Sequence, residues 1–137
     1  MNIAPAITNQ LLGTSGVTAI VGTRIYPEYD RQADKTYPLA VYKVENVTTY
    51  MANDGPTGFE TGDYVIAAIG ETYADADAVA SAIQSALDGA RGTWSGVTIQ
   101  GVFLKDDGVS DDVVTEPQTE EILFYTKELT FSVSYNK

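Results

Sequence analysis

Carboxylates are the only side chains in this sequence that are numerous enough to form a chemical site. The chain of 137 residues has 19 Asp and Glu against 8 Lys and Arg, with neither His nor Cys. The usual zinc ligands and the nucleophile–histidine pairs of hydrolases are therefore excluded. Asp106, Asp107 and Gly108, followed by Asp111 and Asp112, have the composition of a calcium loop. An EF-hand needs alternating acids before the glycine and a glutamate six residues after it, so we expect no metal site here.

Other catalytic patterns are equally weak. Gly13, Gly16 and Gly22 lack the spacing and the lysine of a phosphate-binding loop. So acidic a chain does not exclude a pair of carboxylates of the glycosidase type, but nothing selects two partners among the acids. The sequence thus predicts no catalytic residue, no cofactor and no enzyme activity.

The negative charge is concentrated in the second half of the chain. Residues 1–58 hold five acids and four bases, whereas residues 59–137 hold fourteen acids and four bases, and the net charge is −11. Such a chain repels phosphate backbones, so we do not expect it to bind nucleic acid by charge neutralisation. The densest run, residues 106–121, has seven acids and no base: Asp106, Asp107, Asp111, Asp112, Glu116, Glu120 and Glu121. Because unpaired charges resist burial, we expect this run to form a mobile loop.

The segment 72–89 predicts a helix that has no charged outer face. Thr72 and Asp75 form a capping pair at its start, and Gly89 supplies a left-handed stop. One side carries a stripe expected to pack on a sheet: Tyr73, Ala76, Ala80, Ile83 and Leu87. The opposite side carries only small residues: Ala74, Ala78, Ser81, Ala82 and Ser85. A surface helix usually has charges there, so we expect a second copy of the protein to cover it. The alternative is a small-residue helix that tolerates exposure.

The remaining pattern predicts an α+β fold in a single domain, residues 1–137. We expect a mostly antiparallel β-sheet, with the long Ala-rich helix and a shorter N-terminal helix packed on it. In the first part of the chain we expect a helix over 3–12, a helical turn or strand start over 17–21, an extended segment over 23–26 and an exposed loop over 27–38. Residues 39–50 and 63–69 should form a hairpin with a long tip. After the Ala-rich helix we expect a loop over 92–96 and strands over 97–104 and 129–135. A shift of phase between 122–124 and Leu129 predicts a bulge or a break.

The order of these segments resembles the tail completion proteins of long-tailed bacteriophages, also called tail terminator or head–tail joining proteins. The resemblance rests on VTAIVGTRIYP at 17–27, YPLAVYKVENV at 37–47 and GDYVIAAIGETY running into the Ala-rich helix, followed by TIQGVFLKDD and ELTFSVSYNK. It covers nearly the whole chain. No run of eighteen apolar residues and no secretory signal is present, so we expect neither a membrane nor export.

The resemblance implies a homo-hexameric ring at the head–tail junction of a virion, assembled in the host cytoplasm. Such a ring caps the tail tube, ends its polymerisation and joins the tail to the head or neck. Its partners would be the tail tube protein and a neck or connector protein, and DNA would pass through without specific binding. Two alternatives remain: a neck or head-completion protein on the portal side, or a small acidic binding module or inhibitor.

In such a ring the sequence offers two kinds of surface. For the subunit interface we expect Ala74, Ala78, Ala82 and Ser85 on the helix, with Arg31 and Lys35 from the loop 27–38. A merely solvated loop is the alternative for Arg31 and Lys35. We expect the acidic run 106–121 to face either the lumen, where it would let DNA slip, or a docking face, with solubility alone as the alternative.

Overall fold

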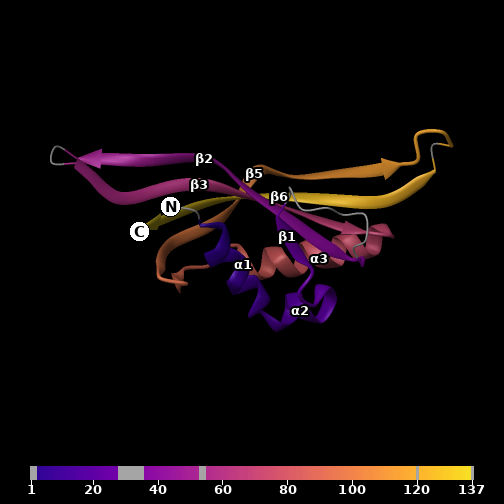
Figure 1. Cartoon of the computed structure of the whole chain (residues 1–137), viewed down its shortest axis with the longest axis horizontal. Coiled ribbons are helices and arrows are strands. Elements are labelled where there is room, and N and C mark those ends of the chain that lie inside the picture. The colour runs from indigo at the N-terminus through magenta and orange to yellow at the C-terminus, as the bar shows by residue number, and fades with distance from the viewer. Residues whose placement is uncertain (1–2, 28–35, 53–54, 120, 137) are drawn as a thin grey trace.

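In the described residues the fold is a curled six-stranded sheet with three helices on one side (Figure 1). The computed structural model describes residues 3–27, 36–52, 55–119 and 121–136. The elements are α1 (Ala4–Leu12), α2 (Ser15–Val21), β1 (Ile25–Pro27), β2 (Leu39–Ala52), β3 (Gly55–Gly70), α3 (Tyr73–Leu87), β4 (Gly92–Trp94), β5 (Val97–Thr115) and β6 (Ile122–Asn136).

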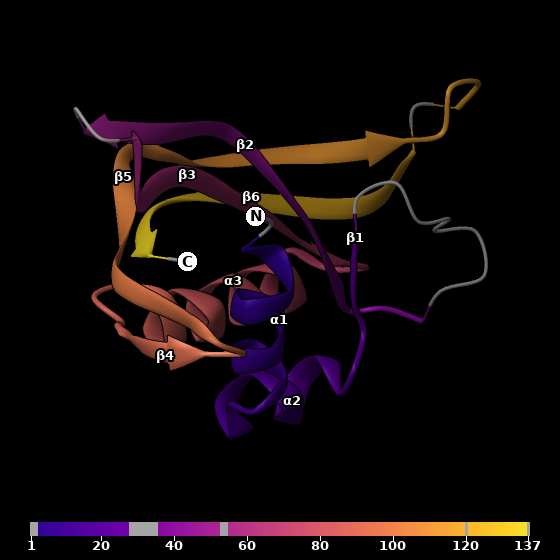
Figure 2. The same ribbon diagram turned by 60° about the vertical axis from the view of Figure 1, so that its left-hand side comes forward.

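The sheet has the strand order β1-β2-β3-β6-β5-β4. The pair β1–β2 is parallel and every other pair is antiparallel. Figure 2 shows α1 and α3 beneath the crossing strands, with α2 below α1. The predicted α+β class and the mostly antiparallel sheet are therefore confirmed. The ambiguous segment 17–21 lies in a helix, α2, whose Val17 and Val21 are buried.

The core lies between the helices and the central strands. Leu129, Phe131, Val133 and Tyr135 on β6 are at most 1% exposed, as their alternation with polar residues predicts. Tyr64 on β3 is also fully buried, and its hydroxyl lies 3.1 Å from the Thr8 hydroxyl on α1. Burial raises the pKa of Tyr64 far above its ordinary value, so the phenol stays neutral and can share this hydrogen bond.

The helix α3 forms as its sequence predicts. The Thr72 side chain accepts a hydrogen bond from the Asp75 backbone N–H at 3.2 Å, and Gly89 has a φ of +80°. The stripe at Ala76, Ala80, Ile83 and Leu87 is buried, together with Val79. The prediction that Tyr73 belongs to the buried stripe was wrong. Tyr73 is 51% exposed because it lies at the first helical position, where its ring makes a T-shaped contact with the Tyr125 ring.

Three strands are longer than expected, and one expected loop is a short strand. The tip between β2 and β3 is short, because both strands continue to Ala52 and Gly55. Residues 92–94 form β4 instead of a loop, and β5 continues far beyond residue 104. The bulge or break predicted between 122–124 and Leu129 was wrong, because β6 is continuous and pairs with β5 without a shift from Phe124 to Leu129. The large bulge lies in β5 instead. Four residues of β5, 105–108, lie opposite the single residue Thr130 of β6.

Candidate assembly surfaces

Two hairpin arms extend from the body in opposite directions (Figures 1 and 2). We define the β2–β3 arm as residues 46–52 and 55–61, and the β5–β6 arm as residues 109–115 and 122–126. Each arm is the outer part of a hairpin whose inner part belongs to the six-stranded sheet. A two-stranded ribbon without a second layer is marginally stable in water. Residues 59–61 still pair with β6 and residues 125–126 with β3, so only the outer ends of the arms are ribbons of this kind.

Both arms expose large apolar side chains. On the β2–β3 arm, Val47, Tyr50 and Met51 are 45–66% exposed. On the β5–β6 arm, five residues are 41–46% exposed: Val109, Val113, Val114, Ile122 and Leu123. Val113 pairs with Tyr125 and Val114 with Phe124, so these neighbouring valines point to opposite faces of the ribbon. Apolar surface of this kind on a projecting element indicates a protein contact.

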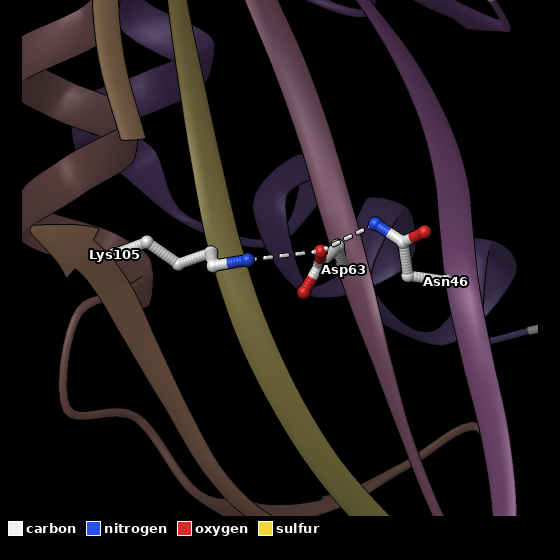
Figure 3. A network of polar contacts seen from close by, with 3 residues as sticks. All are labelled: Asn46, Asp63 and Lys105. Atoms are coloured by element: carbon white, nitrogen blue, oxygen red, sulfur yellow. Dashed lines mark hydrogen bonds and ion pairs between the residues drawn. The ribbon is translucent and has the colours of Figure 1, made fainter. Parts of the chain in front are cut away.

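The bases of the two arms are tied to one buried carboxylate (Figure 3). Asp63 on β3 is 8% exposed, and its Oδ2 accepts a hydrogen bond from Asn46 Nδ2 at 2.9 Å and lies 3.2 Å from Lys105 Nζ. Asn46 lies in the bulge of β2 with a φ of +56°, and Lys105 lies in the bulge of β5. Because bulges bend a strand, these contacts fix the points at which the arms leave the body.

A second buried acid lies within the β2–β3 arm itself. Glu60 is 3% exposed, and its Oε2 accepts a hydrogen bond from Thr49 Oγ1 at 2.8 Å. Burial and the Glu60 carboxylate together raise the pKa of Tyr135, which lies opposite Glu60 on β6. The arm is thus anchored to the core through polar groups at its inner end, while its outer apolar residues remain exposed.

Most of the acidic run lies in a strand, and only its end lies in a turn. Residues 106–115 belong to β5, and the hairpin closes with a hydrogen bond from the Glu116 N–H to the Glu121 carbonyl at 2.8 Å. The expectation of a loop was therefore wrong for residues 106–115, because the strand leaves the described acids of this stretch in water. Asp111 and Asp112 point to opposite faces and are exposed. Glu120 and the side chains of Asp106 and Asp107 lie outside the described residues.

A lysine contact joins α3 to the base of the β5–β6 arm. Lys127 Nζ donates a hydrogen bond to Asp77 Oδ1 at 2.9 Å, and this bond raises the pKa of Lys127. Asp111 lies opposite Lys127 in the sheet register. A positive charge therefore lies between two acids where the arm begins, whereas Asp112 on the other face lies opposite the uncharged Thr126.

The outer face of α3 is exposed in the single chain. Ala74, Ala78, Ser81 and Ser85 form an exposed stripe, whereas Ala82 is half-buried and packs against the core. Arg31 and Lys35, the other predicted interface residues, lie outside the described residues. The described part of the chain holds no group of three or more acids that could bind a metal ion, and none of its helices is long and apolar enough to cross a membrane.

These features define an α+β protein whose candidate site is a set of contact surfaces for other protein chains. The family model described as tail completion protein gp17 matches residues 5–123, so the chain belongs to this family. The chain is therefore a structural protein of a phage tail and a component of a virion. The resemblance found in the sequence is confirmed.

The fold also occurs in a solved virion. A chain of the structure titled "Virion of native gene transfer agent (GTA) particle" superposes with a TM-score of 0.75 at 21% sequence identity, over 97% of this chain and 93% of that chain. Among curated proteins, none matches this sequence significantly. At this identity the likeness is one of fold.

Proposed function

We propose that this tail completion protein forms a homo-hexameric ring at the head–tail junction, where it caps the tail tube, ends its polymerisation and joins the tail to the neck. The pair of oppositely directed arms with exposed apolar side chains carries this proposal. Such arms make a head-to-tail contact between copies possible, and contacts of that kind close into a ring when the rotation fits. The role is structural and involves no catalysis.

The proposed mechanism is steric. One face of the ring matches the last ring of the tail tube protein, and the other face binds a neck or connector protein but does not accept a further tube ring. The net charge of −11 supports a lumen through which DNA passes without specific binding. The ring would assemble in the host cytoplasm before or during docking.

The direct test measures mass and capping together. Six subunits of 14.7 kDa give a ring of about 88 kDa, which native mass spectrometry separates from a monomer or dimer. Added to tail tubes that are still growing, the ring should stop elongation. A ring that bound portal-side components and left tube growth unchanged would instead be a head-completion protein. A monomer or dimer at every concentration would refute the ring.

Substituting Ala78→Glu on α3 should prevent ring assembly. We propose that the stripe of Ala74, Ala78 and Ser85 contacts a neighbouring subunit, with Ala82 at its half-buried margin. A glutamate at the exposed Ala78 would place an unpaired charge in that contact, at a cost of several kcal/mol once desolvated. Native mass spectrometry should show monomers, while circular dichroism should remain that of the folded chain.

Gln84→Glu is the matched control for this substitution. Gln84 is exposed on the same helix but lies on the flank of the stripe, and the change adds the same charge. It should leave the ring intact. If Ala78→Glu assembled as well as Gln84→Glu, the outer face of α3 would be an ordinary solvent-exposed face.

Neutralising the acidic run separates the two proposed placements of these side chains. The variant replaces the seven acids of residues 106–121 by Asn and Gln. If the run faces the lumen, assembly should be normal and DNA passage slow or stalled, because repulsion of the phosphates is lost. If it faces a partner, heads and tails should remain unjoined. Normal passage and normal joining would leave solubility as the role of these acids.

A further inference from the structure

We infer that in the ring the β2–β3 arm of each copy lies against the β5–β6 arm of the next copy. This inference rests on the proposed ring and assigns the contact that builds it. In this arrangement a second copy of this chain covers the exposed apolar residues of both arms.

The directions of the arms favour this pairing. The β2–β3 arm extends from one end of the body and the β5–β6 arm from the opposite end (Figure 1). When copies follow one another around a ring in the same orientation, one arm of each copy points towards the unlike arm of its neighbour. Contact between two like arms would need a two-fold axis, which closes a dimer and stops there.

The outer edges of β2 and β5 also match in direction. Among the described strands β1 pairs with β2 only at residues 40–42, and none pairs with arm residues 46–49 on this edge. The outer edge of β5 is covered as far as Leu104, whose N–H donates a hydrogen bond to Asp88 Oδ1 at 3.0 Å. From Val109 to Thr115 no described strand pairs with this edge. Three successive antiparallel pairings make β2 and β5 run in opposite directions. Between copies these edges would meet as an antiparallel pair.

Charge distinguishes the unlike pairing from the alternatives. The β5–β6 hairpin exposes Asp111, Asp112 and Glu121, with Glu116 half-buried, so two such arms would bring like charges together. Residues 47–51 of the β2–β3 arm are Val-Thr-Thr-Tyr-Met and carry no charge. Pairing two β2–β3 arms would avoid repulsion, but it would leave the apolar residues of both β5–β6 arms in water. Only the unlike pairing covers both arms without opposing acids.

Cysteine cross-linking tests the contact. Because the chain has no cysteine of its own, only the introduced thiols can react. The variant Val47→Cys is mixed with Val113→Cys and treated with a short thiol-reactive cross-linker. We expect linked dimers from the mixture and none from either variant alone. The double variant should give a ladder that ends at six. A matched control, Val47→Cys mixed with Ala19→Cys on the exposed face of α2, should give no product.

A charge pair at Val47 provides a second test that does not depend on linker geometry. Val47 is 48% exposed, so Val47→Lys and Val47→Glu should both fold. Because residue 47 would lie opposite the acidic β5–β6 arm, Val47→Glu should need a subunit concentration for half-assembly that is roughly tenfold or more above that of Val47→Lys. Added salt should reduce this difference.

The outcomes separate this inference from the ring itself. A hexamer that shows neither the 47–113 link nor a difference between Lys and Glu would overturn the arm pairing and leave the proposed function standing. Linked dimers from Val47→Cys alone would show a two-fold contact and overturn it as well. Absence of any hexamer would overturn both proposals.

Discussion

Phe131→Ala is expected to lower the free energy of unfolding by about 3–5 kcal/mol, the usual cost of truncating a buried aromatic residue. Phe131 is fully buried on β6, between Tyr64 on β3 and Leu104 on β5. Domains of this kind have a total stability of about 5–15 kcal/mol, so this one change removes a large share of it. Urea unfolding followed by circular dichroism measures the loss, at one protein concentration because assembly adds stability.

Phe103→Ala is the matched control for the loss of a phenyl ring. Phe103 lies on β5 opposite Ser132 and is 59% exposed. Its removal should change the free energy of unfolding by less than about 0.5 kcal/mol, as for most surface substitutions. Equal losses for the two variants would mean that burial at Phe131 does not hold the sheet and the helices together.

Gly70→Ala is expected to destabilise the fold by about 1–3 kcal/mol, because it overpacks the junction between β3 and α3. A Cβ at Gly70 would lie 2.8 Å from the Ala76 backbone nitrogen and 2.8 Å from the Asp75 Cβ. Backbone cannot move aside as a flexible side chain can, so the first turn of α3 would have to shift. The same urea measurement applies, and a shift of α3 should also weaken the ring through its outer stripe.

Gly16→Ala is the control for the change of glycine to alanine itself. Gly16 lies in α2 with no atom within 4 Å of its would-be Cβ. Alanine there should stabilise the chain by about 0.4–1 kcal/mol, because it restricts the unfolded state. If Gly70→Ala were also neutral or stabilising, the close approach of β3 to α3 would not contribute to the free energy of unfolding.

The two bulges show how the body of the protein sets the direction of its arms. Asn46 and Lys105 are far apart in the sequence, yet both bind Asp63. One carboxylate therefore holds the points at which both arms begin. Farther out, the Phe124 ring on the β5–β6 arm stacks on Tyr37 with 4.3 Å between the ring centroids, and the neighbouring apolar side chains stay exposed.

Local periodicity determined much of the fold. The capping pair of Thr72 and Asp75, the buried stripe of α3 and the alternation of Leu129 to Tyr135 were all predicted, because each depends on residues a few positions apart. The hairpin of β2 and β3 was predicted for the same reason. The family was also recognisable in the order of these segments, and the family match over residues 5–123 confirms it.

The tertiary structure alone decided the form of the acidic run and the length of the arms. Local sequence predicts a loop where seven acids gather within sixteen residues, since it does not show whether a strand would bury them. Pairing with β6 holds 109–115 in a strand, in which Asp111 and Asp112 stay exposed on opposite faces. The contacts of Asn46 and Lys105 with Asp63 also could not be predicted from the sequence. The register across β3, β6 and β5 brings these residues together, and no short-range pattern encodes that register.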